Sequence, residues 1–174
     1  KNFDLAYEWR GMLNLVLGDG KAALNDLEES LRISPQNIEH IYWRGICRLV
    51  TKDFDGAIHD LTRVNDFDSP DSLSMAFTLL WRGLARAQSG NSRYARGEWE
   101  VANEISDKWI NPVQKKIFRG LYGAMRIDFN SAYEAYNEFD KIRYIPHVLI
   151  SQVRNLRLLE FVHPNEREDL EKLA

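Results

Sequence analysis

The stretch IYWRGICRLVTKDFDGAIHDLTRVN, residues 41–65, contains the unit from which most of this chain is built. The unit starts with an aromatic residue followed by arginine and glycine, and an alanine stands twelve residues after that glycine. A large apolar residue follows four residues later. The aromatic-arginine-glycine triplet occurs four times, starting at Trp9, Trp43, Trp81 and Phe118, with spacings of 34, 38 and 37 residues. A recurrence of this length that keeps its internal register indicates an array of structural repeats.

Each unit has the pattern of two amphipathic helices joined by a short turn. Apolar residues recur at three- and four-residue spacing before and after a polar or glycine-containing segment, such as residues 18–20 in the first unit. A capping residue followed by proline punctuates the chain at Ser34-Pro35, Ser69-Pro70 and Asn111-Pro112. The sequence therefore predicts an all-α fold in which helical hairpins follow one another.

This pattern resembles the tetratricopeptide repeat (TPR) family, whose units of about 34 residues carry a small residue in a first helix, helix A. The second helix, helix B, carries an alanine and a bulky apolar residue. The resemblance implies one right-handed α-solenoid over residues 1–174. We expect four TPR-like repeats and a C-terminal cap, at about residues 4–37, 38–71, 72–109, 110–146 and 147–174. The cap is expected because the last apolar face of a solenoid must be covered from water.

The composition disfavours several classes of protein. The chain has 23 lysine and arginine residues against 26 aspartate and glutamate residues, so no basic excess marks a nucleic-acid partner. No apolar run reaches the roughly 18 to 20 residues that a membrane span requires. Cys47 is the single cysteine, which rules out an internal disulfide. We expect a cytoplasmic protein. Because the chain begins at Lys1 and not at methionine, we interpret it as an excised or processed piece of a longer one.

The motifs that could signal catalysis or metal binding are incomplete. Residues 18–21, Gly-Asp-Gly-Lys, lack the first glycine and the final serine or threonine of a phosphate-binding loop. Residues 66–71 lack the glycine and the glutamate of a calcium-binding loop. The four histidines are scattered without metal-ligand spacing, and Cys47 has no neighbouring histidine to activate it. We therefore predict that the chain is not an enzyme and has no cofactor or metal ion.

An acidic residue stands sixteen residues after the arginine of each of the first three triplets. These acids fall on helix B, where the arginine of helix A can reach them, so we expect ion pairs within each repeat in preference to ligand binding by the arginines. The expected pairs are Arg10–Asp26, Arg44–Asp60 and Arg82–Glu98. The fourth triplet arginine, Arg119, has an alanine at this spacing.

The TPR resemblance implies that the A helices line a concave surface, and the residues expected there are mainly aromatic or aliphatic. They are Trp9, Met12, Tyr42, Trp43, Ile46, Leu80, Trp81, Leu84, Phe118 and Leu121. We interpret them as an apolar groove that binds an amphipathic helix or an apolar peptide, with Trp43 and Trp81 as central anchors. Two other interpretations stay open. The tryptophans could be core between repeats, or the helix expected at residues 147–161 could fold back and fill the groove.

Some TPR proteins hold acidic chaperone tails with a clamp of lysine, asparagine and arginine on this surface. The resemblance does not extend to that clamp, because Glu8, Met12, Trp43, Phe77 and Trp81 stand at its positions. We predict a non-catalytic scaffold for protein–protein interaction. The alternatives are a homo-oligomerisation module, and a sensor of a small molecule or peptide that regulates a missing effector domain.

Overall fold

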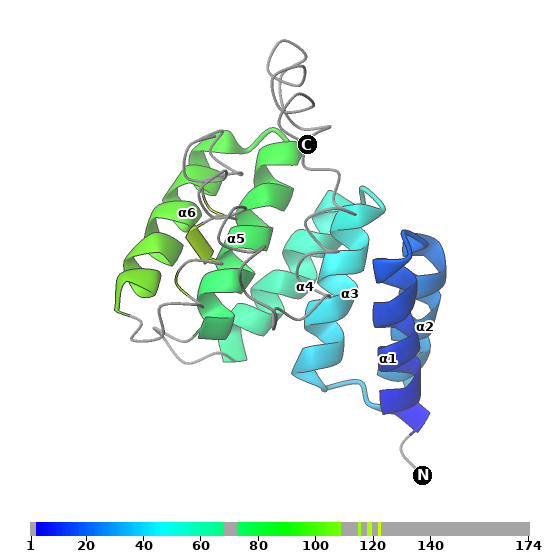
Figure 1. Cartoon of the computed structure of the whole chain (residues 1–174). Helices are drawn as coiled ribbons and strands as arrows, with labels where there is room; N and C mark the ends of the chain where they lie inside the picture. Colours follow the sequence, from blue (N-terminus) through cyan, green and yellow to red (C-terminus); the bar gives the residue numbers. More distant parts are fainter. Residues whose placement is uncertain (1–2, 68–72, 109–114, 116–117, 120–121, 123–174) are drawn as a thin grey trace, which may run out of the picture.

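The computed structural model describes residues 3–67, 73–108, 115, 118–119 and 122, and the regular structure in this part of the chain is α-helical. The helices are α1 (Phe3–Val16), α2 (Gly20–Ile33), α3 (Ile38–Val50), α4 (Phe54–Phe67), α5 (Leu73–Gln88) and α6 (Ser92–Asp107). Each odd-numbered helix packs on the next helix to form a hairpin, while α2 packs on α3 and α4 packs on α5. Figure 1 shows the hairpins side by side in chain order, from α1–α2 at one end to α5–α6 at the other.

This arrangement confirms the predicted all-α repeat array within the described residues. The three hairpins run over residues 3–33, 38–67 and 73–107. The fourth predicted repeat, residues 110–146, lies outside the described residues except for Lys115, Phe118, Arg119 and Tyr122. The cap predicted at residues 147–174, and with it the helix that could fill the groove, lies wholly outside them.

The glycine of each triplet marks a close approach between helix A and helix B. A Cβ atom on Gly11 would lie 3.1 Å from Leu27 Cγ, and the equivalent distance in the second hairpin is 3.0 Å. In the third hairpin a Cβ atom on Gly83 would lie 2.7 Å from Trp99 Cδ1. The large apolar residue sixteen positions after each glycine is buried and fills the space that the absent side chain leaves. The spacing of the repeat therefore reports a contact between two helices.

The turns inside the three hairpins share a left-handed residue at the same place in the register. Gly18 and Gly90 have φ angles of 86° and 89°, and Lys52 has a φ angle of 67° at the equivalent position. Glycine adopts this conformation without steric cost, whereas a residue with a Cβ atom does not. In the first hairpin the next residue, Asp19, caps α2 by accepting a hydrogen bond of 2.9 Å from the backbone N–H of Ala22.

Candidate protein-interaction surface

The first three triplet arginines lie along the A helices α1, α3 and α5, and each reaches an acid on helix B of its own hairpin. The hydrogen bonds from Nε to a carboxylate oxygen measure 2.8, 2.8 and 2.7 Å in the pairs Arg10–Asp26, Arg44–Asp60 and Arg82–Glu98. The structure thus brings together all three pairs predicted from the sixteen-residue spacing. In the second hairpin the hydrogen bond to Asp60 raises the pKa of Arg44. Guanidinium groups held in this way link helix A to helix B in each hairpin.

A second donor reaches each acid from one turn further along helix A. The distances to Asp26, Asp60 and Glu98 are 3.1, 2.7 and 3.0 Å, from Asn14 Nδ2, Arg48 Nη1 and Arg86 Nη1. These donors were not predicted, although each stands four residues after a triplet arginine and so lies on the same helix face. Burial raises the pKa of Glu98 in spite of its two arginine neighbours. Within the described residues, Glu98 Oε2 is buried without a hydrogen-bond partner.

Half of the residues expected to line the groove are instead part of the hydrophobic core. The residues concerned are buried, at 0 to 4% exposed, and are Ile46, Leu80, Trp81, Leu84 and Phe118. The prediction that they line an open groove is wrong, because they are buried together in one hydrophobic cluster with residues of the B helices. Trp81 Nε1 donates a hydrogen bond of 2.9 Å to the Tyr42 hydroxyl, and Phe118 packs edge-on against Phe77 at 5.6 Å. The tenth expected residue, Leu121, lies outside the described residues.

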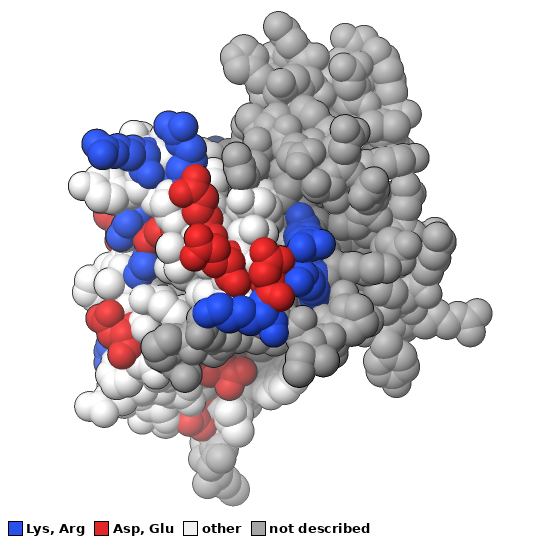
Figure 2. Space-filling view, turned by 90° about the vertical axis from the view of Figure 1, so that its left-hand side faces the viewer, with Lys and Arg blue, Asp and Glu red and all other residues white. Residues whose placement is uncertain are grey.

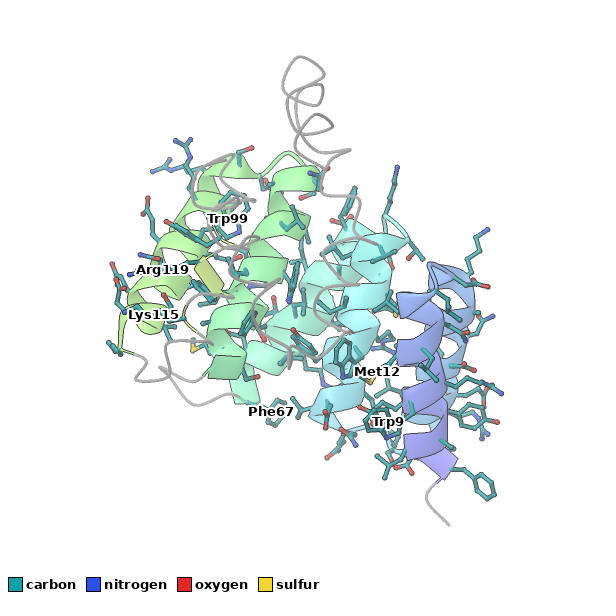
Figure 3. The ribbon with its side chains drawn as sticks, in the orientation of Figure 1. Trp9, Met12, Phe67, Trp99, Lys115 and Arg119 are labelled. Atoms are coloured by element: carbon teal, nitrogen blue, oxygen red, sulfur yellow. The ribbon has the colours of Figure 1, made fainter. Side chains whose placement is uncertain are left out.

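The remaining expected residues are accessible and belong to the first two A helices. The Trp9 side chain on α1 is 63% exposed. Figure 3 shows Trp9 and Met12 projecting to the same side of α1, and Met12 is half-buried. On α3, which packs against α1, Tyr42 and Trp43 are also half-buried and meet edge to face, with ring centroids 5.4 Å apart. We call Trp9, Met12, Tyr42 and Trp43 the aromatic surface.

The two ends of the array differ in chemical character. Five large apolar side chains are exposed on α1 or directly after it, namely Phe3, Leu5, Trp9, Leu13 and Leu17. The α6 end carries charges of both signs, which Figure 2 shows interspersed over that face. There Asp107 pairs with Lys115 at 3.2 Å and with Arg119 at 2.9 Å. The apolar surface open to a partner is therefore concentrated at the α1 end of the described residues.

A buried polar cluster joins the first two hairpins. His40 Nδ1 lies 2.8 Å from Ser30 Oγ, and His40 Nε2 lies 3.2 Å from Glu8 Oε2. These residue types form the triads of hydrolases, but here Ser30 donates its hydroxyl proton to the backbone carbonyl of Asp4 at 2.8 Å. Ser30 and His40 are also completely buried. No substrate can reach this serine, so the cluster is structural.

Burial raises the pKa of the Cys47 thiol to about 12, so this cysteine is not a ready nucleophile. Within the ranges that the structure describes, no group of three or more metal-ligating side chains comes together. Among the same residues, none of the helices combines the length and apolar character that crossing a membrane would take.

Comparison with known proteins finds two longer proteins whose sequences are similar to this chain. No family model matches it. It is 27% identical over 164 residues to a DnaJ protein P58IPK homolog of Arabidopsis thaliana, across 93% of this chain and 31% of that protein. It is 30% identical over 115 residues to the tetratricopeptide repeat and J domain-containing co-chaperone DNJ1 of Cryptococcus neoformans, across 65% of this chain and 22% of that protein. The chain thus spans less than a third of the length of either relative. The similarity supports a TPR-containing chain.

Proposed function

We propose that the chain is a non-catalytic scaffold for protein–protein interaction, and that its aromatic surface binds an amphipathic helix or an apolar peptide. The observation that carries the proposal is the indole of Trp9, which is 63% exposed beside the half-buried Met12. Tryptophan and tyrosine side chains dominate the binding energy of many protein interfaces. One relative is a TPR and J domain-containing co-chaperone, and this supports a protein partner for the chain.

The rigidity of the two hairpins that carry the aromatic surface favours this mode of binding. The arginines that flank the aromatic surface are already hydrogen-bonded to acids within the hairpins. The backbone of α1 and α3 is fixed by packing against α2 and α4. A preformed apolar surface loses little conformational freedom on binding, so the affinity comes mainly from removing apolar area from water. The affinity should therefore depend only weakly on ionic strength.

The test is a titration with a model amphipathic peptide of about 18 residues, roughly five helical turns, that carries leucines along one face. We expect Trp9→Ala to raise the Kd by about tenfold or more, because it removes the most exposed anchor of the surface. The same substitution should leave the chain folded, since the indole is mostly in water. Isothermal titration calorimetry gives the Kd, and circular dichroism checks the fold.

The matched control is Tyr94→Ala, which removes an equally exposed aromatic side chain from α6 at the other end of the array. It should leave the Kd unchanged. A scrambled peptide with the same composition but no apolar face should bind at least about tenfold more weakly. Equal losses from Trp9→Ala and Tyr94→Ala, or equal binding of both peptides, would contradict the proposal. Tight binding that disappears in high salt would point to the charged side chains instead.

A further inference from the structure

Residues at the same place in the repeat register differ sharply in exposure between the first hairpin and the next two. Leu13 on α1 is 60% exposed, whereas its equivalents Cys47 and Ala85 are completely buried. Ala6 is exposed in the same way, and its equivalents His40 and Thr78 are completely buried. The side chain of Arg10 is 63% exposed, against 19% and 10% for its equivalents in the next two triplets. One face of α1 is thus open where α3 and α5 are covered.

Helix B of the hairpin before packs on each of these later A helices. On α3, His40 contacts Ser30 of α2 at 2.8 Å. On α5, Arg82 Nη1 donates a hydrogen bond of 3.3 Å to Thr62 Oγ1 of α4. The charge of Arg44 on α3 likewise interacts with Glu28 of α2. Glu28 and Thr62 stand 34 residues apart, at the same place in successive B helices, so the two interfaces follow one design.

The open face of α1 carries the kinds of side chain that an interface with a preceding helix B needs. Ala6, Arg10, Leu13 and Leu17 follow one another at spacings of four, three and four residues, which places them along one stripe of the helix. We call these four residues the stacking face. It presents a small residue, an arginine and two leucines, whereas the α6 end of the array is charged. An exposed apolar stripe of this kind on a helix is typical of a contact surface.

We propose that the stacking face binds helix B of a further hairpin of this same repeat type, placed before α1 as α2 is placed before α3. The continuity of the two existing interfaces supports this occupant. That helix would set aliphatic or small side chains against Ala6 and Leu13, and a hydrogen-bond acceptor beside Arg10, as Thr62 does for Arg82. Each of the two relatives is more than three times as long as its part that matches this chain. The remaining length of each is enough for further hairpins.

The test extends the full chain by a copy of residues 3–36 placed directly before Phe3, which preserves the 34-residue period. The helix copied from α2 then precedes α1 through residues 34–36 of the linker between α2 and α3, and Phe3 follows where Asn37 stands in that linker. Hydrogen exchange of the α1 amides, followed by mass spectrometry, compares the extended chain with the original. We expect exchange in α1 to slow by about tenfold or more, because stacking suppresses local opening of a terminal helix.

The control is Leu13→Glu, made in the original chain and in the extended chain, where it is placed in the original α1 and not in the copied helix. This position is mostly exposed in the original chain, so the substitution should leave its melting temperature unchanged, yet in the extended chain it should abolish the added protection of α1. Two results would overturn the proposal. One is an appended hairpin that stays unprotected or leaves α1 exchange unchanged. The other is a dimer of the original chain, seen by sedimentation velocity and dissociated by Leu13→Glu, because a second copy would then be the occupant.

Discussion

His40 Nε2 and Glu8 Oε2 lie 3.2 Å apart in the buried junction between the first two hairpins. The hydroxyl proton of Ser30 goes to the Asp4 carbonyl, so His40 Nδ1 must donate to Ser30. The remaining nitrogen, Nε2, then carries a lone pair, and the donor nitrogen of the Asn37 amide lies 3.1 Å from it. A charged Glu8 carboxylate beside this lone pair is unfavourable in a buried site, so the contact favours a proton on Glu8 that is shared with Nε2.

The first prediction follows from this shared proton. Burial and the nearby Glu39 raise the pKa of Glu8 above its ordinary value of 4.5. The folded state therefore holds the proton more tightly than the unfolded state. The associated stability is fully present below pH 4.5 and is lost as the pH rises through the folded pKa. Glu8→Gln removes this titration, so its free energy of unfolding should fall less between pH 4.5 and pH 7 than that of the original chain.

Urea unfolding at a series of pH values measures the effect. Glu39→Gln is a suitable comparison, because Glu39 is exposed and acts on Glu8 only through its charge. It should lower the pKa of Glu8 slightly and keep the pH dependence. Parallel stability curves for the original chain and Glu8→Gln would contradict the assignment of the shared proton.

The second prediction concerns the buried acid of the second hairpin. Asp60 is completely buried and accepts hydrogen bonds from Arg44 and Arg48. Asp60→Asn removes the buried anion from Arg44 and Arg48, and of these two only Arg48 keeps a second carboxylate, Asp53 at 3.5 Å. We therefore expect a loss of about 3 kcal/mol or more in the free energy of unfolding. Asp26→Asn should cost clearly less, because the partner Arg10 remains largely in water. Equal losses in chemical denaturation would refute the difference.

The third prediction compares two helical glycines. Gly83→Ala would place a Cβ atom 2.7 Å from Trp99 Cδ1, and the large indole cannot move without disturbing the core. We expect a loss of about 1 to 3 kcal/mol from this overpacking. Gly97→Ala on α6 meets no atom within 4 Å and should stabilise the helix by about 0.5 to 1 kcal/mol. Thermal unfolding of both variants shows whether each substitution lowers or raises the stability. A change in the same direction for both would refute the argument.

The fourth prediction concerns the turn of the second hairpin. Lys52 has a φ angle of 67° where the other two hairpins have glycine. Lys52→Gly relieves the cost of a Cβ atom in this region and should stabilise the chain by about 0.5 to 1 kcal/mol. Lys52→Ala keeps the Cβ atom and should give no such gain. Denaturation midpoints decide the matter, and a gain from alanine equal to that from glycine would assign the effect to the lost charge.

The fifth prediction separates two tryptophans that share one place in the register. Trp81→Ala should destabilise the chain by about 3 to 5 kcal/mol, because this indole is completely buried and hydrogen-bonded to Tyr42. Trp9→Ala should change stability by less than about 0.5 kcal/mol, because its indole is mostly in water. Urea unfolding provides both values. A large loss from Trp9→Ala would show that α1 is covered in solution.

The local contacts of this fold were predictable from the sequence. Gly11 meets Leu27, and Arg44 meets Asp60, because a fixed number of residues through a hairpin determines which side chains face each other. The all-α architecture follows from the same period. The second donors such as Arg48 were detectable in principle, since they recur one turn after each triplet arginine.

Exposure was decided by the tertiary structure alone. Trp9 and Trp81 stand at the same place in the register, and so do Leu13 and Cys47, yet one member of each pair lies in water and the other in the core. The spacing of residues along a hairpin is a property of the chain, whereas burial depends on which neighbouring hairpin packs against it. For this reason the repeat and its internal pairs can be read from the spacing of residues, whereas the exposure of the aromatic side chains depends on how whole hairpins pack.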